Sequence, residues 1–156
     1  MLLVLGTVAA FQFAERVESA KTAVVAGLAT SVGAAPFELA VHVGNLPQFE
    51  FNVDQLAIMG ALFGVVYRYA VRDDTNPQLN SGVVGAFALT RSLASVRVSP
   101  GCAFAPLACG PPFGYLDLAM AWQLASTLAT SAIAFYAAAA AIDAAVDRGF
   151  LQRYRG

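Results

Sequence analysis

Long apolar stretches separated by short polar connections are the main pattern of this chain. Four such stretches lie at about residues 22–43, 53–71, 79–96 and 116–146. A helix needs about 20 predominantly apolar residues to cross about 30 Å of hydrocarbon. The pattern therefore predicts an all-α integral membrane bundle of about four transmembrane helices, in a single domain.

Capping and helix-breaking residues mark the ends of these stretches. Asp54 opens the second one as a candidate N-terminal cap, and Asn76-Pro77 separates the second from the third. Residues 98–114 contain four prolines and three glycines, so we expect a compact, turn-rich connection there. Residues 1–13 are apolar but too short to cross the membrane. We expect a structured segment at the membrane surface, with a targeting remnant as the alternative.

Composition and charge agree with a membrane protein. Charged residues make up 12% of the chain and hydrophobic residues 58%, whereas soluble domains contain about 25% charged residues. The formal net charge of −1 leaves no basic surface for nucleic acid, which is therefore not an expected partner.

Basic residues alternate between the connections, and this alternation predicts the orientation. Cytoplasmic connections of membrane proteins carry an excess of Lys and Arg. The connection at residues 44–52 has neither, whereas the segments on the opposite side of the predicted bundle carry Arg16, Lys21, Arg68, Arg72, Arg148, Arg153 and Arg155. We therefore expect both termini on the cytoplasmic or stromal side.

Two charged residues lie deep inside predicted spans. Glu38 follows Lys21 by 17 residues, and Arg91 follows Leu79 by 12. At about 1.5 Å per residue, both reach the outer half of the bilayer at a similar depth. Charges at this depth are costly and are usually paired or functional. We therefore expect an ion pair between neighbouring first and third spans, which fixes the helix register or, as the alternative, lines a transport pathway.

His42 is the only histidine, and it lies four residues after Glu38 on the same helix face. A neutral imidazole at the membrane edge can ligate a metal, including the magnesium of a chlorophyll. More often, such a residue is only an interfacial hydrogen-bonding group, and both interpretations stay open. If the chain ligates chlorophyll directly, His42 is the expected ligand.

Small residues predict close helix packing. Gly60 and Gly64 form a GxxxG pattern, and Gly82, Gly85 and Ala86 give the third span a partly small face. Such faces allow helix backbones to approach each other in membranes. We expect the second and third spans to form a tight hairpin.

Tyrosine and arginine residues gather where the second span ends. Tyr67, Arg68, Tyr69 and Arg72 suit a membrane–water interface. With Asp73-Asp74, we expect them to form a turn that contacts a partner subunit.

The remaining reactive residues do not assemble a catalytic site. Cys102 and Cys109 form either a disulfide in an oxidising compartment or two free thiols, and their spacing does not discriminate between these states. No histidine accompanies them, so a zinc site is not expected. With one histidine and no paired catalytic carboxylates, the sequence predicts neither an enzyme nor a redox cofactor.

One central segment resembles a family of multi-span membrane proteins from cyanobacteria and the chloroplasts of plants and algae. This segment is FGVVYRYAVRDDTNPQLNSGVVGAFALTR, Phe63 to Arg91, about a fifth of the chain. The matching pattern is Tyr-Arg-Tyr-Ala-Val-Arg at a helix end, then Asn-Pro-Gln-Leu and a glycine-rich helix. The family offers no activity to assign to individual residues, and the Pro- and Cys-rich loop departs from its pattern.

The resemblance implies a multi-pass thylakoid protein with stromal termini and a lumenal cysteine loop. It implies a non-enzymatic accessory subunit of a photosynthetic pigment–protein complex, most simply photosystem I with its antenna in an alga. Its partners would be photosystem core subunits, light-harvesting antenna subunits and lipids, and its cofactors chlorophyll and carotenoid. A small transporter or channel component and a thylakoid assembly factor are the alternative classes.

Overall fold

A computed structural model describes residues 2–72, 76–103, 108–111 and 114–154, with side chains from residue 13 onward. The described residues confirm the all-α fold class, since their only regular elements are four helices. These are α1 (Leu2–Val41), α2 (Leu46–Val71), α3 (Pro77–Ser95) and α4 (Leu118–Asp147).

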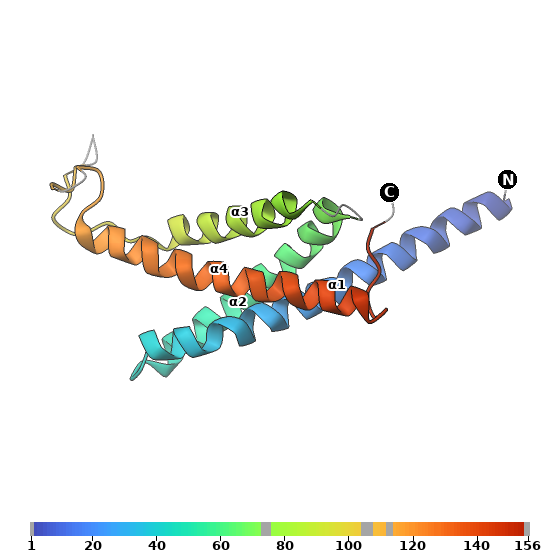
Figure 1. The fold of residues 1–156 in the computed structure, drawn as a ribbon, viewed down its shortest axis with the longest axis horizontal. Helices are drawn as coiled ribbons and strands as arrows, with labels where there is room; N and C mark the ends of the chain where they lie inside the picture. The colour runs from blue at the N-terminus through green and yellow to red at the C-terminus, as the bar shows by residue number, and fades with distance from the viewer. Residues whose placement is uncertain (1, 73–75, 104–107, 112–113, 155–156) are drawn as a thin grey trace.

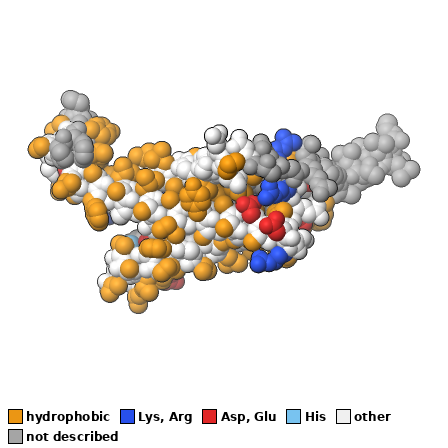
Figure 2. Space-filling model, viewed as in Figure 1, with side chains coloured by type: hydrophobic (Ala, Val, Ile, Leu, Met, Phe, Trp, Pro, Cys, Tyr) orange, Lys and Arg blue, Asp and Glu red, His pale blue; other side chains and the backbone are white. Residues whose placement is uncertain are grey.

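The helices form two hairpins, α1–α2 and α3–α4 (Figure 1). The hairpins lie together where α2 and α4 end, and they diverge toward the α1–α2 turn and the α3–α4 loop. We call the end of the bundle where α2 and α4 terminate the basic end, because the charged side chains gather there (Figure 2). We call the opposite end the loop end.

The first helix is longer than the sequence predicted. It runs unbroken for 40 residues, about 60 Å at 1.5 Å per residue, whereas we expected a span beginning at Thr22 after a separate segment at residues 1–13. The helix continues through residues 14–21 because this charged stretch contains no Gly or Pro to break it, and the span at residues 22–43 stays a prediction. The N-terminal part of α1 projects past the other helices (Figure 1).

The second helix begins seven residues before the predicted start at Val53. Asn45 is its N-cap and accepts a hydrogen bond from the backbone N–H of Gln48, with Pro47 in the first turn. Asp54 is therefore not a cap, and it lies about two turns inside the helix. A proline in the first turn costs no helical hydrogen bond, which explains why the helix starts so early.

The other two helices begin close to their predicted starts. Asn76 caps α3 by accepting from the N–H of Gln78. Asp117 caps α4, and its Oδ1 accepts from the N–H of Met120 at 2.7 Å. This hydrogen bond favours the carboxylate and lowers the pKa of Asp117.

Three helices, α1, α2 and α4, are long and apolar enough to cross a membrane. The predicted fourth crossing, at residues 79–96, does not meet that standard. Helix α3 has 19 residues, about 28 Å, and Arg91 and Ser92 lie among its buried residues. It packs along α4, and of its polar side chains Arg91 and Ser92 are buried, whereas Gln78, Ser81 and Thr90 are exposed.

An aromatic cluster fills the centre of the bundle. The ring centroid of Phe63 lies 5.3 Å from those of Tyr67 and Phe87 and 5.2 Å from that of Phe135. Such contacts add to the free energy gained by burial alone. These rings come from α2, α3 and α4, so the cluster joins the two hairpins.

The GxxxG pattern packs against α1 and not, as expected, against α3. A Cβ on Gly60 would overlap the Thr30 hydroxyl, and one on Gly64 would lie 2.6 Å from the Cβ of Ala26. The tight hairpin is therefore α1–α2. The glycines of α3, Gly82 and Gly85, have no neighbour within 4 Å of an added Cβ.

Candidate functional site

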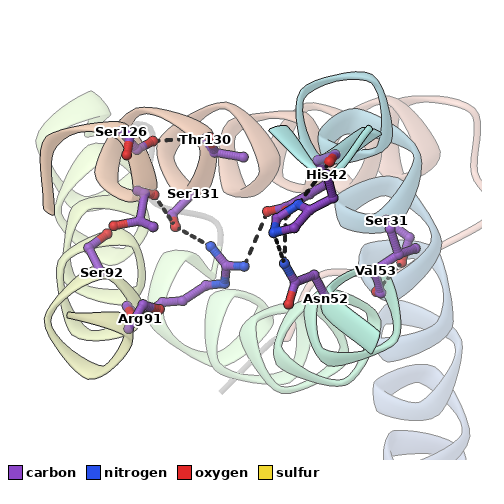
Figure 3. A network of polar contacts seen from close by, with 12 residues as sticks. Ser31, His42, Asn52, Val53, Arg91, Ser92, Ser126, Thr130 and Ser131 are labelled. Atoms are coloured by element: carbon purple, nitrogen blue, oxygen red, sulfur yellow. Dashed lines mark hydrogen bonds and ion pairs between the residues drawn. The ribbon is translucent and has the colours of Figure 1, made fainter. Parts of the chain in front are cut away.

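Five polar residues from all four helical regions meet at the point where the hairpins diverge. We call this set the loop-end cluster, and Figure 3 shows Arg91 extended between α4 and the α1–α2 hairpin. Its members are Glu38, His42, Asn52, Arg91 and Ser131.

The expected ion pair is present. Arg91 Nη2 lies 3.4 Å from Glu38 Oε1, and Nη1 donates to Ser131 Oγ at 2.9 Å. Glu38 is 7% exposed and Arg91 is 5% exposed. The expectation that their helices are neighbours was wrong. Among the described residues α1 and α3 do not pack together, and α4 packs against both, so the long arginine side chain bridges the gap.

His42 is held within this cluster through both ring nitrogens. Nδ1 lies 3.0 Å from the backbone oxygen of Glu38, and Nε2 lies 3.4 Å from Asn52 Nδ2. The same amide nitrogen donates to Glu38 Oε2 at 3.0 Å. A neutral ring that carries its proton on Nδ1 satisfies both contacts. A magnesium ligated by Nε2 would have to displace Asn52, and the chlorophyll-ligand role of His42 stays a prediction.

A second polar cluster surrounds Arg68 at the basic end. Arg68 is 4% exposed. Its Nη2 lies 2.6 Å from Glu15 Oε2, Nη1 donates to Ser19 Oγ at 2.8 Å, and Nε donates to the backbone oxygen of Gln152 at 3.1 Å. The guanidinium therefore joins α1, α2 and the segment after α4.

The segment at residues 149–154 folds back over this cluster. The backbone N–H of Gln152 donates to Glu18 Oε2 at 3.1 Å, and Leu151 is 2% exposed. Arg153 Nη2 lies 3.1 Å from Asp143 Oδ1, and Tyr67 donates to the other Asp143 oxygen at 3.1 Å. The cluster thereby reaches α4 as well.

The predicted interface residues separate into two pairs. Tyr67 and Arg68 are buried inside the chain, whereas Tyr69 is 42% exposed and Arg72 is exposed. Asp73 and Asp74 lie outside the described residues. Sequence reasoning missed the internal partners of Arg68. The signal was present, because Glu15 and Ser19 share a helix face at the same end of the bundle.

The cysteines, whose state the spacing left open, form a disulfide. Cys102 is bonded to Cys109, and the backbones of Ala103 and Ala108 pair between them. Cys109 Sγ lies 3.8 Å from Met120 Sδ on the first turns of α4. The bond thus closes a small ring and fixes it beside α4.

The loop-end cluster and the polar cluster around Arg68 lie on opposite sides of the central aromatic cluster. Along α4, Ser131 belongs to the loop-end cluster, Phe135 to the aromatic cluster and Asp143 to the basic end. Within the described part of the chain, no group of three His, Cys, Asp or Glu residues is placed to hold a metal ion. The polar side chains mainly tie helices together.

Comparison with known proteins gave no match. No protein-family model, curated protein or solved structure matches this chain.

Proposed function

We propose that this protein is a non-enzymatic accessory subunit of a larger membrane complex, in which lipids and neighbouring subunits cover its helices. The observation that carries the proposal is the low burial of its spans. In the most apolar parts of α1, α2 and α4, only 28%, 22% and 33% of the residues are buried inside the chain. Most of the span surface is left for other molecules.

The exposed surface has the chemistry that such contacts require. Large apolar side chains project outward along every helix, and contiguous exposed patches of this kind mark protein or membrane contacts. Examples are Val24, Leu28 and Val32 on α1, Ile58 and Leu62 on α2, Leu89 and Leu93 on α3, and Trp122, Ile133 and Tyr136 on α4.

The resemblance of residues 63–91 points to a photosynthetic complex. On this basis, the chain is an accessory subunit of a thylakoid pigment–protein complex, photosystem I with its antenna, with both termini stromal. Chlorophyll and carotenoid would lie against the apolar flanks, beside core and antenna subunits. The disulfide supports a lumenal loop, because disulfides persist in oxidising compartments.

A transporter is the second candidate, and the buried Glu38 and Arg91 favour it. Both charges, however, are paired with each other, and the aromatic cluster closes the bundle on one side of them. A pathway would need polar groups that continue past Phe63 and Phe135, and within the described residues no hydrogen bond links the loop-end cluster to the polar groups of the basic end. A transport function is therefore a weaker candidate than the role as an accessory subunit. No observation favours an assembly factor.

Purification of the tagged chain from its native membranes tests the proposal. A subunit co-migrates with pigments and core proteins at a fixed stoichiometry through a density gradient and a salt wash. Migration in a separate, pigment-free fraction would overturn the photosynthetic assignment. Migration without any other protein would overturn the subunit proposal as well.

A further inference from the structure

The hydrogen bonds around His42 fit the neutral form of its ring. Nδ1 lies 3.0 Å from the backbone oxygen of Glu38, which can only accept, so Nδ1 carries the proton. Nε2 lies 3.4 Å from the amide nitrogen of Asn52, which can only donate. The other contacts of Asn52 fix this orientation, because Nδ2 donates to Glu38 Oε2 at 3.0 Å and Oδ1 accepts from Gln48 Nε2 at 2.8 Å. A proton on Nε2 would therefore point at another donor.

The charged groups next to the ring are one of each sign. Glu38 Oε2 lies 3.5 Å from Nδ1 of His42, and the other oxygen of Glu38 pairs with Arg91 of α3. From α2 and α4, the cluster receives Asn52 and Ser131, which carry no charge. With a neutral ring, the charges of the loop-end cluster therefore cancel.

A second proton on the ring would leave this cluster with an excess positive charge. Glu38 and Arg91 are both buried, and a charge at such a site is costly unless it is paired. The acidic residues of α2 nearby, Glu50 and Asp54, are exposed, and no hydrogen bond or ion pair among the described residues joins them to the ring. Entry of water between the hairpins would lower the cost.

The cluster lies beside a close contact between the hairpins. A Cβ on Gly33 of α1 would lie 2.9 Å from the Cβ of Ala137 on α4, and Glu38 follows Gly33 by five residues. Beyond this contact the hairpins diverge (Figure 1), and Figure 2 shows a recess between their loop ends. The imidazole of His42 is 23% exposed, so a proton can reach it from solvent. The hairpins can separate further at the loop end while they stay packed at Gly33.

We propose that protonation of His42 opens the two hairpins at the loop end. The proton on Nε2 displaces Asn52, the imidazolium competes with Arg91 for Glu38, and the bond that joins the hairpins is weakened. Figure 3 shows the arrangement, with His42 and Asn52 side by side at the end of the extended Arg91. Imidazoles change charge between about pH 5 and pH 8, so the device responds to mild acidification. It does not depend on the role as an accessory subunit.

A distance measurement between the two loop ends tests the opening. Spin labels on Val43→Cys and Leu118→Cys, at sites 79% and 71% exposed, report the separation of the hairpins in the full chain in detergent micelles. The native cysteines are bonded to each other and do not take the label. As the pH falls from about 8 to about 5, the population with a longer distance between the labels should rise.

The protonation of the ring can be followed in parallel. His42 is the only histidine, so a chain with ¹⁵N-labelled histidine and a histidine-free affinity tag gives the nitrogen signals of this ring alone. The neutral ring, with its proton on Nδ1, should be replaced by the doubly protonated ring over the same pH range as the opening. An unchanged distance while the ring titrates, or a ring that keeps a single proton throughout this range, would overturn the inference. These measurements on the wild-type ring decide the matter even if a variant fails to fold.

Two substitutions separate His42 from the other acids and bases of the chain. His42→Gln cannot take up the proton, so the distance between the labels should no longer depend on pH in this range. Asn52→Asp places a carboxylate opposite Nε2, so the charges cancel only when the ring is protonated. Its pH dependence should therefore be inverted, with the hairpins closed at low pH. Equal opening of His42→Gln and wild type, or opening of Asn52→Asp at low pH, would also overturn the inference.

Discussion

Arg91 and Glu38 make an ion pair, with Nη2 3.4 Å from Oε1, although their helices α3 and α1 do not pack against each other. The reach of the arginine side chain spans the separation, and Ser131 of α4 supports the guanidinium on the way. At the loop end, where the hairpins diverge (Figure 1), this bond joins one hairpin to the other.

Removal of either charge should therefore destabilise the bundle. Breaking a buried pair by removing one partner costs about 3–5 kcal/mol, because the other charge is left uncompensated. We expect Glu38→Gln and Arg91→Leu each to lower the free energy of unfolding in mixed micelles by about this amount. The double variant should lose less than the sum of the two. Purely additive losses would contradict the pairing.

Gly60 and Gly82 form a matched pair of substitutions in α2 and α3. A Cβ on Gly60 would lie 2.8 Å from Thr30 Cβ and 2.9 Å from the backbone oxygen of Ala26. Gly60→Ala should therefore separate α1 from α2, at a cost of about 1–3 kcal/mol. Gly82→Ala has open space and should stabilise the chain by about 0.5–1 kcal/mol through helix propensity. Thermal unfolding in detergent measures both changes, and equal effects would refute the α1–α2 crossing.

Arg68 was expected to contact a partner subunit, but in the structure its guanidinium is bonded to other residues of the same chain. Arg68→Ala should cost about 3–5 kcal/mol of unfolding free energy, since Glu15 loses its buried partner. Arg68→Lys keeps the charge but not the planar set of donors, and should recover part of the loss. Arg16→Ala, at an exposed site, is the control. A stable Arg68→Ala chain that fails only to assemble would restore the original interface interpretation.

Reduction of the Cys102–Cys109 disulfide should destabilise the oxidised chain by about 2 kcal/mol, from the loop entropy of a small ring. A membrane-impermeant thiol reagent should react only after reduction, and from the side opposite an epitope placed near Arg153. Reaction from the same side as that epitope would contradict the predicted topology. The Cys102→Ser, Cys109→Ser double variant is the control for specific labelling.

Much of this fold was readable from local patterns. The apolar stretches predicted the helices, and Asn76-Pro77 predicted the break before α3. The similar depths of Glu38 and Arg91 along their helices predicted their ion pair. These inferences depend on composition and helical rise, which the sequence contains directly.

The errors came from properties that only the packed chain decides. The partner of Gly60 and Gly64 was misassigned, because a small face does not say which helix fills it. The start of α1 was missed, since charged residues end an apolar span without ending a helix. The internal bonds of Arg68 were missed because Gln152, 84 residues later in the chain, returns to it only after α4 is in place.

The hydrogen bond between Arg68 and Gln152 can form only late in synthesis, after α4 is complete. Helices α1 and α2 leave the ribosome with Glu15 and Ser19 already available to Arg68, but without the backbone oxygen of Gln152 that Nε requires. Only when residues 149–154 have been synthesised can Leu151 cover the site. A chain that ends inside α4 would therefore hold an incompletely bonded arginine at the basic end, because the hydrogen bond from Nε to residue 152 could not form.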